Sequence, residues 1–313
     1  MKLEPLFFEP VYKNVIWGGE DIAKKLNRDV QGNDIGESWE LSAHPNGISY
    51  LKNNKEKISL IDLFDNKEIK KQIFGTKCQN MKKFPILIKF IDAKQKLSIQ
   101  VHPDDQYAEK YENDSGKSEA WYIMDCKKDA KIIYGLNENA EKEDINNVVE
   151  NIKEYINYQS IEKGDFIPIS AGTVHAILDG TLICEIQQSS DVTYRVYDWD
   201  RIGKDGKPRQ LHKEKAIDVI NTRNESNIFK CNNITKQDEN IYKSNIFCVD
   251  MVNIKNNTSF ISNKESFTTY IVIDGEGKIK SEGLTYDLVK GNTFVIPAEL
   301  GKYELSGQVR WYR

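Results

Sequence analysis

The sequence lacks paired cysteines, long apolar runs and a large net charge, the features that mark disulfide-rich, membrane-spanning and nucleic-acid-binding proteins. Its five cysteines are scattered with no Cys-x-x-Cys pair, which excludes a disulfide framework and indicates free thiols in a reducing, cytoplasmic environment. No apolar run approaches the roughly 20 residues that span a bilayer, and the N-terminal stretch, with its early acids and prolines, does not resemble a signal peptide. A formal net charge of −4 gives no electrostatic reason to expect nucleic acid or a membrane as a partner.

Histidine is also scarce, so each histidine is informative. There are four, His44, His102, His175 and His212. Because paired cysteines are absent, any metal ion must be held by imidazole and carboxylate groups. We expect His44 and His212 to be ordinary structural residues, since an isolated histidine is more often a hydrogen-bonded core or surface residue than a ligand.

Most of the patterned sequence predicts short strands. The apolar and β-branched runs, bounded by Gly, Asp and Pro, recur about every ten residues, which is typical of a sandwich or barrel; they are 84–93, 118–124, 130–136, 164–170, 172–178, 182–190 and 192–200. Helical patterns are few: 59–75, with Ser59 as N-cap, 143–156 and 211–222. The sequence therefore predicts a mainly β fold with a few peripheral helices.

Two β units are expected, separated by the polar stretch 221–245. The predicted domains are residues 1–235, a catalytic barrel, and 236–313, a smaller β domain without metal ligands. In each unit five residues separate a glycine, Gly164 or Gly291, from a small or proline residue followed by alanine, and in this register His175 corresponds to Lys302. This partial repeat predicts a duplicated barrel with one functional half.

Residues 98–104, Ser-Ile-Gln-Val-His-Pro-Asp, end an otherwise apolar region. Residues two apart in a strand point to the same side, so Gln100 and His102 share one face. Pro103 has no N–H for a β-ladder and ends the strand there. The pattern fits either a solvated strand end or a metal site.

Glu119 and His175 favour the metal site. Glu119 begins an apolar strand and shares a face with Trp121, and His175 follows a turn that Gly172 permits. A barrel interior can bring such inward side chains together. Two imidazoles and a carboxylate form a catalytic zinc set, to which Gln100 could add a weak fourth ligand.

Further charged residues lie in runs that otherwise predict a core. Glu185 and Arg195 form either a structural ion pair or an acid–base group and an anion clamp. Lys89 interrupts an apolar strand, so it either reaches the surface or serves a buried anion. Lys117 lies two residues before Glu119 and shares its face. Three cations near one metal ion suit a phosphorylated or otherwise anionic substrate.

Six blocks, in this order, resemble the type I phosphomannose isomerases, most closely the short bacterial subgroup without the large helical insertion. The blocks are 16–26, 35–47, 84–105, 116–124, 164–177 and 184–201, and the resemblance extends from about Pro5 to Asp218 and more loosely to the C-terminus. One departure is Ser170, where barrels of this superfamily, the cupins, usually have proline before the small-Gly-Thr turn.

The resemblance implies cupin-type double-stranded β-helix (jelly-roll) barrels and one zinc ion per chain. It implies interconversion of mannose 6-phosphate and fructose 6-phosphate. Carried over by position, the metal ligands are Gln100, His102, Glu119 and His175, the catalytic residues are Arg195, Glu185 and Lys117, and the phosphate-binding residues are Ser98 and Lys89.

This reaction moves a proton between C2 and C1 through an enediol, so it needs a stabilised oxyanion and a base. Glu185, Lys117 and a zinc-bound hydroxide are the candidate bases, and the sequence does not choose among them. Two alternative functions use the same ligands: a non-haem Fe(II) oxygenase, in which two histidines and a carboxylate bind iron, and a non-catalytic sugar-phosphate-binding cupin. The oligomeric state is left open.

Overall fold

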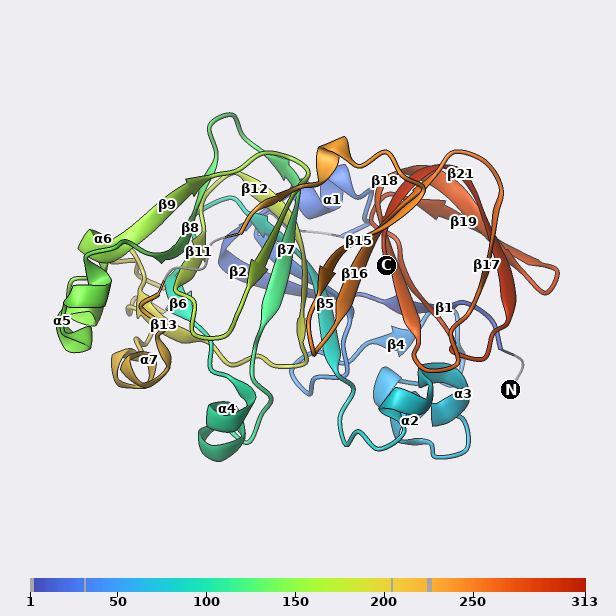
Figure 1. The fold of residues 1–313 in the computed structure, drawn as a ribbon, viewed down its shortest axis with the longest axis horizontal. Coiled ribbons are helices and arrows are strands. Elements are labelled where there is room, and N and C mark those ends of the chain that lie inside the picture. Colours follow the sequence, from blue (N-terminus) through green and yellow to red (C-terminus); the bar gives the residue numbers. More distant parts are fainter. Residues whose placement is uncertain (1–2, 31, 204, 224–226) are drawn as a thin grey trace. The chain divides into compact units, whose positions relative to one another are not determined.

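The structure, a computed structural model, describes residues 3–30, 32–203, 205–223 and 227–313. It is mainly β, as the strand pattern predicts, and its sheets are antiparallel wherever the register of two strands is defined (Figure 1). Each of the seven strands predicted between residues 84 and 200 is confirmed. Among the described residues, no helix is both long and apolar enough to cross a membrane.

The chain divides into two compact units. The terminal unit comprises Met1–Val11, Trp39–Leu87 and Asn233–Arg313, and the central unit comprises Tyr12–Ser38 and Ile88–Asn232. The division between residues 232 and 233 falls inside the polar stretch 221–245. It differs from the predicted domains 1–235 and 236–313 in placing two N-terminal segments with the C-terminal strands, and the predicted domain boundaries stay a prediction.

Two sheets build the central unit. The five-stranded sheet has the order β13-β6-β11-β8-β9 and comprises Tyr194–Tyr197, Ile99–Val101, His175–Ile177, Lys131–Leu136 and Ile156–Ser160. The seven-stranded sheet has the order β14-β10-β7-β12-β5-β3-β2 and comprises Phe229–Lys230, Asp165–Ile169, Glu119–Cys126, Thr181–Gln188, Ile86–Ala93, Ile35–Leu41 and Val11–Gly19.

Alternation along the strands separates two cores in this unit. Ile132 packs with Trp121 and Ile167 of the seven-stranded sheet, so this face of β8 looks into the barrel. Its neighbour Ile133 packs on the other face with Val148 and Ala216, which belong to helices. The barrel interior is therefore mainly apolar, and the polar side chains that point into it stand out.

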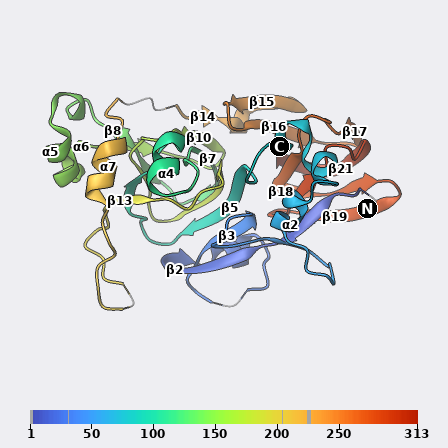
Figure 2. The same cartoon turned by 90° about the horizontal axis from the view of Figure 1, so that it is seen from below.

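Short helices cover the outer face of the five-stranded sheet. They are α5 (Ile145–Glu150), α6 (Ile152–Tyr155) and α7 (Lys213–Val219), and both views place α7 beside β13 (Figure 2). The remaining helices of this unit are α1 (Asp21–Lys25), α4 (Asp105–Tyr111) and the 3-10 turn η2 (Ala140–Lys142).

The single helix predicted over 143–156 is wrong in one respect, because it breaks at Asn151. That residue has φ −110° and ψ 33°, and its side-chain amide donates to the side-chain and backbone oxygens of Asn147. Asparagine side chains compete in this way with helical hydrogen bonds. The predicted apolar face, from Ile145 to Ile156, is nevertheless packed on the sheet.

The terminal unit is built on one nine-stranded sheet. Its main path is β15-β16-β21-β18-β20-β1-β4, with β17 on β21 and β19 on β18. The strands are Asp238–Lys243, Cys248–Ile254, Lys302–Tyr312, Thr268–Ser281, Thr293–Ile296, Leu6–Glu9, Tyr50–Leu51, Thr258–Ile261 and Leu284–Val289. The pairing of β1 with β20, through Leu6 and Val295, explains why the N-terminal residues belong to this unit.

The segment predicted as helical, 59–75, contains two helices, α2 (Leu60–Asp65) and α3 (Lys70–Phe74). The 3-10 turn η1 (Thr76–Cys78) follows it. Ser59 is confirmed as the N-cap, in a reciprocal capping box with Asp62. The helix stops at Asn66, whose side chain accepts from the backbone N–H of Glu68 and forms a turn. The last 3-10 turn of the chain, η3, is Cys231–Asn233.

The partial repeat corresponds to matching elements in the two units. Gly164 and Gly291 have φ of 95° and 89°, and each precedes a strand, β10 or β20. His175 begins β11 and Lys302 begins β21, as the sequence register predicts. The second copy therefore has the strand but not the histidine.

Candidate metal centre

Three strands of the five-stranded sheet place polar side chains in one row. β6 lies between β11 and β13, and Gln100 is directly opposite both His175 and Arg195. Residues directly opposite in an antiparallel pair share a face. His175, Gln100 and Arg195 therefore point to the same side, which is the barrel interior because Tyr134, opposite His175, packs in the inner core.

The seven-stranded sheet contributes a second polar row. Glu119 begins β7 opposite Gln187 of β12, and Trp121 of β7 is opposite Glu185. Since Trp121 belongs to the inner core, Glu119 and Glu185 also face inward. Both glutamates are almost completely buried.

Loop contacts bring the ends of the two rows together. The ends of the loop that contains α4 are joined by a hydrogen bond from the backbone N–H of Lys117 to the carbonyl of Pro103, at 3.0 Å. On the other side, Gly172 donates to the carbonyl of His102, at 2.9 Å. Gly172 has φ +85°, which favours glycine, so this turn before β11 needs that residue.

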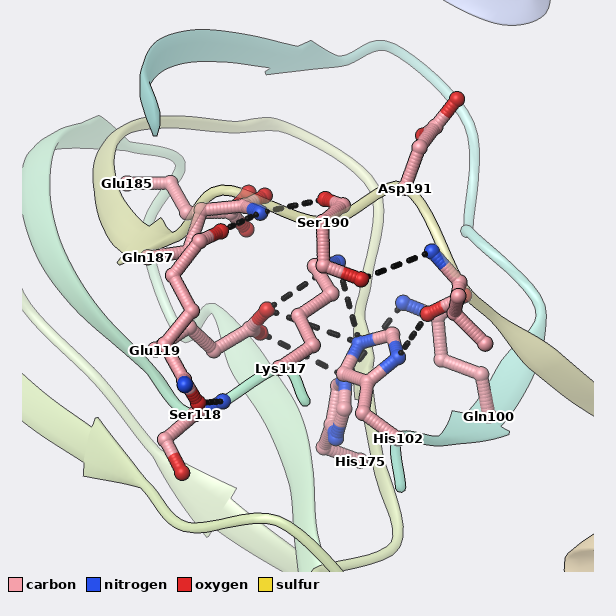
Figure 3. Close-up of polar contacts among 12 residues, drawn as sticks. Gln100, His102, Lys117, Ser118, Glu119, His175, Glu185, Gln187, Ser190 and Asp191 are labelled. Atoms are coloured by element: carbon pink, nitrogen blue, oxygen red, sulfur yellow. Dashed lines mark hydrogen bonds and ion pairs between the residues drawn. The ribbon is translucent and has the colours of Figure 1, made fainter. Parts of the chain in front are cut away.

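His102, Glu119 and His175 form the one group of three potential metal ligands that the described residues contain (Figure 3). Their ligand atoms all lie within 4.8 Å of one another, and all three side chains are buried. Nε2 of His102 is 3.5 Å from Oε2 of Glu119, and Nε2 of His175 is 3.5 Å from Oε1. Lys117 lies beside this group, with Nζ 3.2 Å from Glu119 Oε2 and 3.1 Å from His102 Nε2.

Both imidazoles are held so that Nε2 faces the group. Nδ1 of His102 bonds the carbonyl of Val192, and Nδ1 of His175 bonds the carbonyl of Thr173, each at 2.9 Å. A carbonyl only accepts, so Nδ1 carries the proton and Nε2 keeps its lone pair, as in metal-bound histidines. Burial, together with the charge of Lys117, holds the pKa of His102 well below its usual range, and burial lowers the pKa of His175 to about 4.

These residues fit a zinc ion. Ligands 2.0–2.1 Å from a tetrahedral zinc lie roughly 3.3–3.4 Å apart, close to the 3.5 Å between each imidazole nitrogen and Glu119. Glu119 Oε1 is buried and receives no hydrogen bond from the described residues. Burial, and then the charge of Glu185, raise the pKa of Glu119, so a cation at this position would supply the missing stabilisation of the carboxylate.

Gln100 lies next to the histidines. Its Nε2 is 3.3 Å from Nε2 of His175, and its Oε1 is 3.3 Å from Oγ of Ser98. A half-turn of the amide exchanges these two atoms, and it would place the oxygen toward the metal group. The side chain is therefore positioned to be a fourth ligand.

Glu185 and Lys89 form a buried pair beside the metal group. Lys89 Nζ is 3.5 Å from Glu185 Oε1 and 3.8 Å from Glu37 Oε2. Glu185 Oε2 accepts from the indole N–H of Trp121, at 3.1 Å. Burial acts to raise the pKa of Glu185, but the charges of Lys89 and Lys117 outweigh it, so this pKa is lowered and the carboxylate is ionised at neutral pH.

A cavity of about 300 Å³ connects these residues with Arg195. This volume lies at the lower end of the range typical of small-molecule sites. The predicted residues that line it are Ser98, Lys89, Gln100, Lys117, Glu185 and Arg195. Arg195 is half-buried and donates from Nη1 to the carbonyl of Gln210, at 2.8 Å. Every predicted site residue is thus in the metal group or in the cavity wall.

Sequence reasoning missed three charged residues of the cavity wall, Glu37, Asp191 and Arg209. Glu37 shares a face of β3 with apolar Ile35 and Trp39, so the strand argument used for Glu119 could have found it. Asp191 and Arg209 lie in loops, where alternation gives no signal.

The two remaining histidines have structural contacts. His212 Nδ1 accepts the backbone N–H of Arg195 at 3.2 Å, and His44 Nδ1 accepts that of Asn46 at 3.2 Å. Neither belongs to a metal-ligand group within the described ranges, and the prediction that both are ordinary structural residues stays a prediction.

Known proteins resemble the chain over almost its whole length. The family model "Phosphomannose isomerase type I, catalytic domain" matches residues 6–128, and "Mannose-6-phosphate isomerase, cupin domain" matches residues 238–313. Mannose-6-phosphate isomerase ManA of Bacillus subtilis is 38% identical, over 98% of this chain and 97% of ManA. Probable mannose-6-phosphate isomerase GmuF of the same organism is 37% identical, over 97% of this chain and 96% of GmuF.

A solved structure shares the fold. The crystal structure of the mannose 6-phosphate isomerase from Bacillus subtilis superposes with a TM-score of 0.87 at 34% identity, and 98% of each chain is covered. The similarity therefore includes both units.

Proposed function

The chain belongs to the type I phosphomannose isomerase family, and from this premise we propose that it interconverts mannose 6-phosphate and fructose 6-phosphate with one bound zinc ion, through an enediol. As a member of that family the chain is an isomerase. The observation that carries the zinc proposal is the convergence of His102, Glu119 and His175, with both imidazole Nε2 atoms directed at one point. Gln100 would complete the ligand set.

Zinc, when bound, supplies Lewis-acid polarisation of the substrate's carbonyl and hydroxyl oxygens. Arg195 places a permanent positive charge in the cavity that Gln100 and Lys117 also line, where it would stabilise the oxyanion that develops as the C–H proton leaves. A fixed guanidinium is effective because it needs no reorganisation during the reaction. The hydrogen bond from Nη1 to the Gln210 carbonyl holds it in place.

Glu185 is the proton-transfer base that the geometry favours. It lines the cavity, and its lowered pKa keeps it ionised near neutral pH, the state in which a base can accept a proton. Lys117, in contrast, is engaged with Glu119 and His102. We assign Lys117 to balancing charge at the metal group and Glu185 to moving the proton between C2 and C1.

Ser98 and Lys89 are the proposed phosphate-binding residues, since both line the cavity. Binding of the remote phosphate would hold the reacting carbons beside the metal and lower the entropic cost of the reaction. The contact of Lys89 with Glu37 and Glu185 means that part of its charge is already balanced before substrate binds.

The test combines metal analysis with a coupled assay. Purified protein should contain about one zinc per chain and convert mannose 6-phosphate to fructose 6-phosphate without oxygen uptake. His102→Ala and His175→Ala should lose both zinc and nearly all turnover, because one histidine, Glu119 and the weak ligand Gln100 are too few strong ligands for a stable site. Oxygen consumption would instead favour the iron oxygenase, and metal and sugar-phosphate binding without turnover would favour the non-catalytic cupin.

A further inference from the structure

One buried carboxylate next to the cavity has no part in the proposed mechanism. Asp198 is only 5% exposed, yet it follows β13 directly in the sequence. Arg209 holds it through two parallel hydrogen bonds, from Nε to Oδ2 at 2.7 Å and from Nη2 to Oδ1 at 2.5 Å. Such a fork fixes both the position and the plane of a guanidinium.

The chain that carries Arg209 also holds Arg195. We call residues 209–212 the strap. Gln210 accepts from the Arg195 guanidinium at 2.8 Å, and His212 donates its backbone N–H to the Arg195 carbonyl at 2.8 Å. The backbone N–H of Arg195 in turn donates to Nδ1 of His212, at 3.2 Å. The Asp198–Arg209 fork and these three bonds join the strap to β13 and the residue that follows it.

Both guanidiniums therefore reach the cavity wall from one small assembly. The fork uses Nε and one N–H of Nη2, which leaves three N–H groups of Arg209 to donate elsewhere. The two lysines of the wall also contact carboxylates, Lys89 that of Glu185 and Lys117 that of Glu119, and each has only three N–H donors in all. An anionic group in this cavity would find its least committed donors on the arginine side.

We propose that Asp198 is a positioning residue for substrate binding, which holds Arg209 against the anionic end of the sugar phosphate and fixes the strap that orients Arg195. The proposal rests on the proposed function and adds a specificity element to it. A planar guanidinium held by a fork matches a phosphate in charge and geometry, whereas an unheld arginine would lose side-chain entropy on each binding event.

The experiment compares Asp198→Asn and Arg209→Lys with the wild type and with Asp200→Asn. Asp200 is a matched control, because it lies in the same turn but contacts the Tyr197 hydroxyl. The measurements are KM and kcat for mannose 6-phosphate, inhibition by inorganic phosphate, zinc content and the melting temperature. Arg209→Lys keeps the charge and loses the fork, so it tests the proposal even where Asp198→Asn folds poorly.

We expect both test variants to raise KM and to weaken phosphate inhibition by about tenfold, as for the loss of one charge-assisted hydrogen bond. Zinc content should not change, and Asp200→Asn should match the wild type. Phosphate inhibition within twofold of wild type in both variants would overturn the proposal, and a lower melting temperature alone would make Asp198 purely structural. If the wild type itself does not turn over the substrate, the proposed function fails, and protection by phosphate against thermal unfolding then decides between the variants.

Discussion

Arg195 has a charge that cannot be lost, and both its backbone N–H and its carbonyl are hydrogen-bonded to His212. Burial, and then the nearby Arg209, lower its pKa, but a guanidinium stays protonated at any physiological pH. Arg195→Ala should keep zinc and lose kcat by about two to three powers of ten, the usual effect of removing one oxyanion-stabilising donor. Steady-state kinetics with metal analysis tests this, and a rise in KM at unchanged kcat would assign Arg195 to substrate binding instead.

Glu185 allows a separate test of the base. Glu185→Gln keeps the shape of the side chain, and its amide oxygen can still accept from Trp121. Because an amide cannot take up the proton, kcat should fall by about two to four powers of ten. Exchange of the C2 hydrogen with solvent should fall in parallel, and exchange at the wild-type rate would show that another group is the base.

His175 gives the metal-free protein a pH-dependent stability. Its pKa is about 4 in the folded state and roughly 6.5 in an unfolded chain. Between these values the unfolded state binds one more proton, so the contribution to stability is complete above pH 6.5 and is lost as the pH falls toward 4. The slope is about 1.4 kcal/mol per pH unit for each such group.

Urea unfolding of chelator-treated protein between pH 4 and 7 measures this slope. His102 has a lowered pKa for the same main reason, burial, so it adds to the wild-type slope. His175→Asn should reduce the slope by the contribution of one proton, about 1.4 kcal/mol per pH unit, whatever its effect on the free energy of unfolding at pH 7. An unchanged slope would mean that His175 is already accessible to protons in the folded state.

At the scale of elements, the N-cap of α2 is a local source of stability in the terminal unit. Ser59 Oγ accepts the backbone N–H of Asp62 at 3.0 Å, and Asp62 Oδ2 accepts that of Ser59 at 2.8 Å. Ser59→Ala should lower the free energy of unfolding by about 1 kcal/mol and leave kcat unchanged. Chemical denaturation checks this. Ser59→Asp is the matched control, since it restores an acceptor, and equal losses in the two variants would argue against capping.

The elements also show what the sequence could predict. Alternation along a strand is local information, so it identified Gln100, Glu119 and Glu185 as inward residues before their partners were known. The break at Asn151 depends on a side chain that competes with the backbone hydrogen bonds. The spacing of apolar residues carries no information about this competition. Apolar faces were therefore more predictable than helix ends.

Long-range pairing was the least predictable feature. Leu6 pairs with Val295, almost the whole chain away, and no local pattern encodes that choice. Arg209 lines the cavity from a loop, and its fork with Asp198 joins that loop to the residue after β13. Such residues are determined by tertiary contacts, and these become visible only in the structure.

At the scale of the whole molecule, we expect metal binding to stabilise the two units to different extents. A ligand that binds only the folded state stabilises the part of the structure that forms its site. The proposed zinc ligands lie on or beside β6, β7 and β11 of the central unit. At the position that corresponds to His175, the terminal unit has Lys302.

Removal of the metal should therefore act locally. Hydrogen exchange of the backbone amides in β6, β7 and β11 should become faster after chelation, because their opening no longer has to release zinc. The amides of β18 and β21 should exchange at unchanged rates, and these strands serve as the internal control. Added zinc should restore the protection together with turnover. Equal acceleration in both units would contradict a local effect of the metal and would indicate that the metal stabilises the chain as one cooperative whole.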